Sequence, residues 1–174
     1  RGVEHRSDPA HIPQCRTLPT PYPSLMPRLR LAAAQLDLVV GDLEGNAARI
    51  LDAYEQADAA GADLVVFPEL ALTGYPPEDL LLKPAFVAAA SEMLEKVAAR
   101  TGRLAAVIGF PETGRDLFNA AAVCAHGKVQ GVYRKHLLPN YAVFDEQRYF
   151  TPSSTDGPLF VIAGVRVAVT GAGP

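Results

Sequence analysis

The sequence predicts an α/β fold in which two helices pack against a mixed β-sheet. Short apolar segments alternate with two segments of helical periodicity, and the later part of the chain contains paired apolar segments joined by turn residues. Hydrophobic residues make up 49% of the 174 residues, which is enough to form one sizeable core. This composition excludes wholesale disorder.

Charge, apolar run length and cysteine content narrow the class of protein. The net charge is 16 − 19 = −3, so the basic footprint of a nucleic-acid-binding protein is absent. No apolar run reaches the roughly 18 residues of a membrane span. Two cysteines cannot form a disulfide framework, so we expect a reducing, cytoplasmic setting.

The first half of the fold is predicted from alternating strands and helices. Strands are expected where short apolar runs occur, at residues 29–36, 63–67 and 104–110. Helices are expected where apolar side chains recur at helical spacing, at residues 42–60 and 84–100. The apolar face of the second helix is expected to comprise Phe86, Ala89, Ala90, Met93, Leu94 and Val97. Strand–helix–strand connections of this kind are right-handed crossovers.

The second half is predicted to add two antiparallel hairpins. Residues 117–125 are expected to pair with residues 128–133 around a turn at His126-Gly127. In the same way, residues 159–162 and 165–169 are expected to pair around Ala163-Gly164.

The two ends of the chain differ from this pattern. Proline is frequent before residue 29, so residues 1–28 are expected to form a disordered tail. Met26 is the expected true start, which would make the preceding residues a cloning or gene-calling artefact; a functional tail is the alternative. Residues 29–174 are expected to form one partial domain, because the chain stops directly after a strong predicted strand.

Glu69 directly follows a predicted buried strand, in the run Phe-Pro-Glu-Leu. Ligands of open α/β sheets bind beyond the carboxyl ends of strands, and a carboxylate held there suits a general base. A surface acid in a loop is the alternative. The following residues, 72–82, contain Gly74 and Pro76-Pro77 and are expected to form a rigid, irregular loop. This loop is either the wall of a pocket or a simple connection to the next helix.

Lys135 lies in a segment, residues 133–150, that is dense in polar and aromatic side chains. A desolvated lysine near a carboxylate can stabilise transition-state charge or shuttle a proton. A solvated surface lysine is the alternative. Cys124 is expected to be a small buried hydrophobe, because small apolar residues flank it. The histidines show no metal-ligand spacing, so no metal site is expected.

Three motifs resemble a known family: FPEL at residues 67–70, TGYPPEDLL at 73–81 and RKHLLPNYAVFDEQRYF at 134–150. From about residue 29 to residue 170 the chain resembles the carbon–nitrogen hydrolase (nitrilase) superfamily. More narrowly, it resembles the amino-terminal glutaminase domain of glutamine-dependent NAD synthetases, to which the second and third motifs are far more specific. The resemblance implies a nitrilase-type αββα sandwich, incomplete and limited to its first half.

The resemblance also implies roles for four residues. Glu69 would be the general base of a Glu–Lys–Cys triad, and Lys135 would stabilise the tetrahedral intermediate. Tyr141 would contact the glutamine substrate. Glu146 would be a second acid that orients the lysine. This set implies attack of a thiolate on the glutamine amide, a thioester intermediate and release of ammonia.

The cysteine of that triad is missing from the sequence. In the family it lies in a run of the type Ile-Cys-Glu-Asp, which would follow Thr170. This chain has Gly171-Ala172-Gly173-Pro174 there. The chain alone is therefore expected to be inactive, because a base and a lysine do not replace a covalent nucleophile.

The parent enzyme implied by the resemblance is a cytoplasmic, homo-oligomeric ligase. Its synthetase domain would use ATP and Mg to amidate deamido-NAD with the ammonia, whereas the present domain would use no cofactor. The expected partners are L-glutamine and that synthetase domain, with neither nucleic acid nor membrane. Two alternatives are a catalytically inert fragment and a stand-alone amidase of the same superfamily.

Overall fold

A computed structural model describes residues 27–141 and 145–171, so nearly all of the tail predicted for residues 1–28 lies outside the described residues. Its helices are α1 (Leu43–Ala59), α2 (Pro84–Ala98) and two short 3-10 helices, η1 (Glu78–Leu82) and η2 (Glu146–Arg148). Its strands are β1 (Leu31–Ala33), β2 (Leu64–Val66), β3 (Ala105–Thr113), β4 (Leu117–Ala125), β5 (Lys128–Arg134), β6 (Leu159–Ile162) and β7 (Val165–Ala168).

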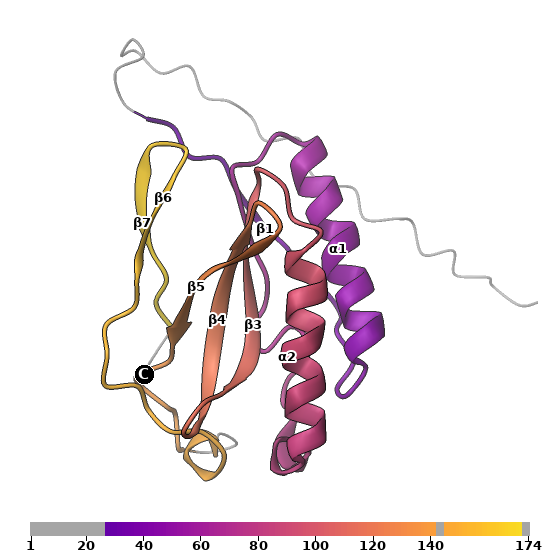
Figure 1. Ribbon diagram of the computed structural model, residues 1–174, viewed down its shortest axis with the longest axis vertical. Coiled ribbons are helices and arrows are strands. Elements are labelled where there is room, and N and C mark those ends of the chain that lie inside the picture. Colours follow the sequence, from indigo (N-terminus) through magenta and orange to yellow (C-terminus); the bar gives the residue numbers. More distant parts are fainter. Residues whose placement is uncertain (1–26, 142–144, 172–174) are drawn as a thin grey trace, which may run out of the picture.

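Five strands form a mixed sheet in the order β1-β2-β3-β4-β5. The first three are parallel, whereas β4 runs antiparallel to both β3 and β5. Helices α1 and α2 cover one face of this sheet (Figure 1). The predicted mixed sheet and both predicted helices are therefore confirmed. The strand expected at residues 29–36 is shorter than predicted, because β1 lies at the sheet edge and pairs with β2 over three residues.

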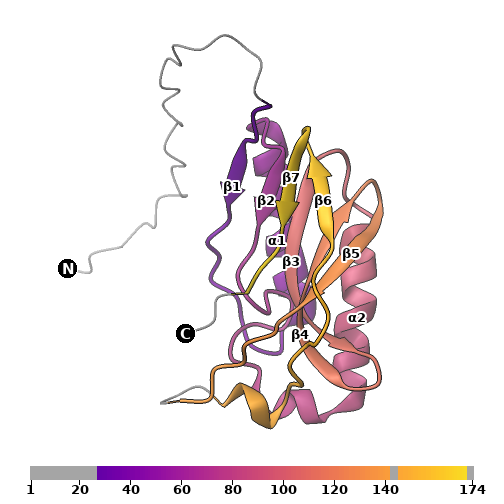
Figure 2. The same ribbon diagram turned by 90° about the vertical axis from the view of Figure 1, so that its left-hand side faces the viewer.

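Strands β6 and β7 form a separate two-stranded sheet on the opposite face (Figure 2). Their side chains Phe160 and Val167 pack against a buried cluster of the larger sheet that includes Val107 and Val123. The described residues thus form three layers, one of helices and two of strands. These are three of the four layers of the expected αββα sandwich.

Helix α1 begins and ends as the sequence predicts. The Asp42 side chain accepts a hydrogen bond from the Gly45 N–H (2.9 Å) and so caps the helix. The chain leaves the helix through Gly61, whose φ of 74° suits glycine. Ile50 and Tyr54 are buried against the sheet.

Helix α2 begins with Pro84 in its first turn. Proline is suited to this position, because a backbone N–H in the first turn would have no partner within the helix. Its buried face runs through Val87, Ala90, Leu94 and Val97, at the spacing of one helical stripe. Ala90, Leu94 and Val97 of the predicted apolar face are thus buried, whereas Phe86, Ala89 and Met93 are partly buried because the stripe in contact with the sheet passes through Val87.

Both predicted hairpins are present, with turns at the predicted residues. His126 and Gly127 have φ values of 54° and 76°, and Ala163 and Gly164 have φ values of 49° and 77°. Two consecutive positive φ angles define the tight turn whose twist matches a hairpin. Within the part of the chain that the structure covers, no helix has the length and apolar character needed to cross a membrane.

Candidate active site

A β-bulge positions Lys135. At the β4–β5 turn Ala125 pairs with Lys128, but beyond a register shift at Val123/Cys124 the pairing is Ala120 with Arg134. The extra residue advances β5 by one position, so Lys135 lies opposite Asn119 and donates its backbone N–H to the Asn119 carbonyl at 2.8 Å. Arg134, on the other face, pairs with Glu112 instead.

Glu69 lies on a loop that crosses the sheet at a glycine. The loop leaves β2 through Phe67 and passes over Gly109 of β3, where a Cβ atom would be 2.9 Å from the Pro68 carbonyl oxygen and closer still to the Leu70 nitrogen. Glycine is required here for space. The Glu69 side chain remains 44% exposed, so it is accessible from the adjoining cavity.

Three charged side chains meet at this point. The Lys135 ammonium lies 2.8 Å from Glu69 Oε1 and 3.0 Å from Glu146 Oε1. The side chains of Lys135 and Glu146 are only 6% and 8% exposed. The structure therefore brings together three of the four residues singled out from the sequence. We call Glu69, Lys135 and Glu146 the charged cluster.

The environment of the cluster favours protonation of both buried members. Burial lowers the pKa of Lys135, but the hydrogen bonds and charges of Glu69 and Glu146 outweigh burial and raise this pKa above its usual value. Burial raises the pKa of Glu146, and the charge of Glu69 adds to this rise, while the Lys135 ammonium opposes it. Lys135 is consequently a fixed cation at neutral pH.

A cavity of about 240 Å³ opens onto Glu69 and Lys135. Thr170 and Gly171, which follow β7, also line this cavity. The Gly171 N–H donates to the Tyr133 hydroxyl at 2.9 Å, and a Cβ atom on Gly171 would lie 3.1 Å from Lys135 Cγ. The segment after β7 thus lies directly against the lysine.

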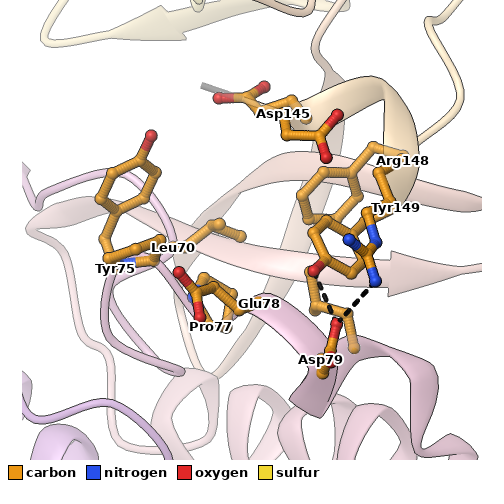
Figure 3. Close-up of a pocket in the computed structure, with 12 residues that line it drawn as sticks. Leu70, Tyr75, Pro77, Glu78, Asp79, Asp145, Arg148 and Tyr149 are labelled. Carbon is orange, nitrogen blue, oxygen red and sulfur yellow. Dashed lines mark hydrogen bonds and ion pairs between the residues drawn. The ribbon is translucent and has the colours of Figure 1, made fainter. Parts of the chain in front are cut away.

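A second cavity, of about 310 Å³, lies on the Glu146 side of the cluster (Figure 3). The loop at residues 72–82 forms one wall, which confirms the prediction that this loop is a pocket wall. Across the cavity, the Tyr149 hydroxyl donates to Asp79 Oδ1 at 2.7 Å, and Arg148 lies 3.5 Å from the same oxygen. These contacts hold the two walls together.

Two further residues singled out from the sequence, Tyr141 and Cys124, are not members of the charged cluster. Tyr141 is 53% exposed and is not among the residues that line either cavity, so its glutamine contact stays a prediction. Cys124 is buried inside β4, and burial raises the pKa of its thiol to about 12, as expected for a core residue. Among the described residues, no group of His, Cys, Asp or Glu side chains could hold a metal ion.

Asn119 is the member of this site that the sequence did not reveal. Its Nδ2 lies 2.5 Å from Glu69 Oε1 and 3.5 Å from Glu146 Oε2. The only signal in the sequence is a single amide at the start of an otherwise small and apolar run, NAAAVCA. Asn at such a place is also compatible with a strand end facing solvent.

The chain belongs to the carbon–nitrogen hydrolase family, whose model matches residues 30–173. Over 144 residues it is 50% identical to the glutamine-dependent NAD(+) synthetase of Xylella fastidiosa, covering 81% of this chain and 26% of that protein. It is 46% identical over 147 residues to the synthetase of Thermotoga maritima, covering 83% and 25%. The chain therefore spans about a quarter of the length of these relatives.

Solved structures show the same fold. The glutamine-dependent NAD+ synthetase of Acinetobacter baumannii, in complex with ADP, superposes with a TM-score of 0.75 and 35% identity, covering 79% of this chain and 26% of that chain. A mutant amidase from Nesterenkonia sp. AN1, with an acetamide moiety bound covalently at its active-site cysteine, gives a TM-score of 0.70 and 26% identity, covering 82% and 55%. The nitrilase-superfamily fold expected from the sequence is confirmed.

Proposed function

We propose that this chain contributes the base and the cation of a glutamine-hydrolysing site whose ammonia is used to make NAD. One observation supports this most strongly: the Lys135 ammonium is held by Glu69 and Glu146 at the wall of a cavity that the segment after β7 also lines. Synthetases from two organisms are 50% and 46% identical to this chain over the aligned residues, and their names state the dependence on glutamine.

The chemistry follows from the positions of these groups. A cysteine following β7 would lose its thiol proton to Glu69, and its sulfur would bond to the amide carbon of glutamine. The Lys135 cation would stabilise the negative charge that develops on the carbonyl oxygen. Glu69 would then return the proton to the leaving nitrogen as the carbon–nitrogen bond breaks, which releases ammonia. Water would hydrolyse the thioester to glutamate and restore the thiol.

The finer parts of the proposal concern the parent protein. The ammonia would amidate deamido-NAD in a synthetase domain that binds ATP and Mg, and the parent would assemble from several copies. No cofactor is assigned to the present residues. A reducing cytoplasmic setting suits this scheme, because it keeps a thiol nucleophile free.

A chimera tests the proposal. Residues 29–170 of this chain would replace the aligned segment of the Xylella fastidiosa synthetase, so that the sequence after residue 170 comes from the relative. We expect the chimera to form NAD with either glutamine or added ammonia as nitrogen source. Glu69→Gln should lower the glutamine-dependent rate by at least about a hundredfold, as expected for loss of a general base, and leave the ammonia-dependent rate unchanged.

The exposed acid Glu44 provides a matched control, because Glu44→Gln removes a carboxylate from helix α1, which contributes no residue to the cluster. A chimera that folds and uses ammonia but not glutamine would contradict the proposal. Hydrolysis of simple amides without any use of glutamine would instead support the stand-alone amidase, which the fold likeness to the Nesterenkonia enzyme keeps as the second candidate.

A further inference from the structure

Asn119 touches every member of the charged cluster. It lies on β4 and is 4% exposed. Its carbonyl oxygen accepts the Lys135 backbone N–H at 2.8 Å, which fixes the start of the lysine side chain. Its Nδ2 donates to Glu69 Oε1 at 2.5 Å and to Glu146 Oε2 at 3.5 Å. One residue therefore connects two carboxylates and the backbone of the lysine.

A carboxamide has the right chemistry for this place. Its NH2 group has two hydrogens and no charge, so it can donate to two carboxylates without altering the charge balance. Two carboxylates and one ammonium leave a net charge of −1 in a largely buried site. Without the Asn119 amide, Lys135 would be the one hydrogen-bond donor shared by both carboxylates. An aspartate of the same shape would present only acceptors, and a leucine of similar volume would donate nothing.

We propose that Asn119 is a positioning residue that fixes the orientation of Glu69 and Glu146 toward the Lys135 ammonium. Its consequence for turnover rests on the proposed function, whereas its effect on the carboxylates does not. A purely structural role, filling a polar gap in the core, would affect stability alone.

The test measures the titration of Glu146 in the 174-residue chain by carbon-13 NMR of the glutamate side-chain carboxyls. Hydrogen bonds to an ionised carboxylate lower its pKa, and the Asn119 amide has this effect on Glu146. We expect Asn119→Leu to move the Glu146 titration upward by about half to one pH unit. Asn119→Asp should move it further, because it adds a negative charge beside the site.

The other ionisable groups that face Glu146 are Lys135, Glu69 and Tyr75, and none of them changes in these variants. Asn46 supplies a matched control. It is 0% exposed, and its side chain bonds to the backbone of Val39 and Leu72, away from the cluster. Asn46→Leu should therefore lower stability and leave the Glu146 titration in place.

An unchanged Glu146 titration in the Asn119 variants would overturn the inference. If Asn119→Leu does not fold, Asn119→Ser keeps one donor hydrogen and is expected to shift the titration upward by less than Asn119→Asp. The outcome is independent of the chimera experiment. A chimera that cannot use glutamine would refute the proposed function and leave the NMR result valid, and an unshifted Glu146 would refute only the role of Asn119.

Discussion

Lys135 owes its charge to two neighbours. Its side chain is 6% exposed, and a lone ammonium at such a place would shed its proton or destabilise the fold. Glu69 and Glu146, at 2.8 and 3.0 Å, make the charged form the stable one. The cation is thus a property of the cluster and depends on every member of it.

Removing the lysine tests this dependence. Lys135→Met leaves two carboxylates without their shared cation, so we expect a loss of about 3 kcal/mol in the free energy of unfolding at neutral pH. Because the pKa of Lys135 is higher in the folded chain, its stabilisation is complete below the usual lysine value of 10.5 and is lost as the pH rises through the folded-state pKa.

Urea unfolding of both proteins between pH 7 and pH 11.5 provides the measurement. The difference in unfolding free energy should stay constant up to about pH 10 and then shrink. The exposed Lys128 is the control, and Lys128→Met should change stability by less than about 0.5 kcal/mol. If the difference in unfolding free energy between the wild type and Lys135→Met stays the same through pH 11.5, the ammonium charge is not what stabilises the wild type.

Position along the chain predicted two of the charged residues. Glu69 and Lys135 each follow the end of a strand, where side chains reach a common edge of the sheet. Asn119 could not be found in this way. Its role depends on which residue at the end of β5 lies opposite it, and this pairing is set by the bulge rather than by the turn at His126.

At the scale of the element, the β4–β5 bulge decides which cation faces the cavity. A regular ladder continued from the Ala125–Lys128 pair would place Arg134 opposite Asn119. The bulge moves Lys135 to that position and sends Arg134 to Glu112 on the other face. The sequence predicts the hairpin from its turn residues, but an extra residue within a strand has no comparable local signal.

Gly109 allows the Glu69 loop to lie on the sheet. We expect Gly109→Ala to destabilise the chain by about 1–3 kcal/mol, because the new methyl group would meet the backbone of Pro68 and Leu70. The contact between Glu69 and Lys135 should lengthen as the loop moves away. Thermal unfolding and the nitrogen-15 NMR shift of the Lys135 ammonium would report the two effects.

Gly102→Ala is the control for the general effects of replacing a glycine by alanine, namely lower backbone entropy of the unfolded chain and one added methyl group. A Cβ atom at Gly102 would have its nearest neighbour, the Tyr54 hydroxyl, 3.8 Å away, which is ordinary contact. This variant should be as stable as the wild type and keep the Lys135 signal unchanged. Equal effects of the two substitutions would contradict the close approach at Gly109.

At the scale of the whole molecule, the outer sheet leaves apolar side chains in solvent. Strands β6 and β7 lie with one side on the larger sheet (Figure 2). Leu159 and Val161 of β6 are 69% and 75% exposed. The sequence predicted this hairpin, but not the face of the sheet that it covers. Each of its strands has four residues that alternate between partly buried and exposed. Such a short alternating strand could pack on either face of the larger sheet.

These exposed side chains should make the chain self-associate. Flat apolar strand surfaces are common sites of association, and a lysine within them opposes it. We expect Val161→Lys to reduce concentration-dependent association in sedimentation velocity. Gln56→Lys adds the same charge on the exposed side of α1 and should change little. Equal association of Val161→Lys and the wild type would assign the contact to another surface.

The separation in sequence of Glu69 and Lys135, 66 residues, has a consequence for how the chain folds. The Lys135 ammonium can lose its hydration only when the Glu69 and Glu146 carboxylates are in their native positions. These positions form only after β2 to β5 have paired. The cluster is therefore expected to form late, after the rate-limiting step of folding. Mutations at its residues should change the unfolding rate and hardly change the folding rate, which corresponds to kinetic φ-values near zero. Damage to the cluster would then shorten the lifetime of the folded chain and leave the speed of folding almost unchanged.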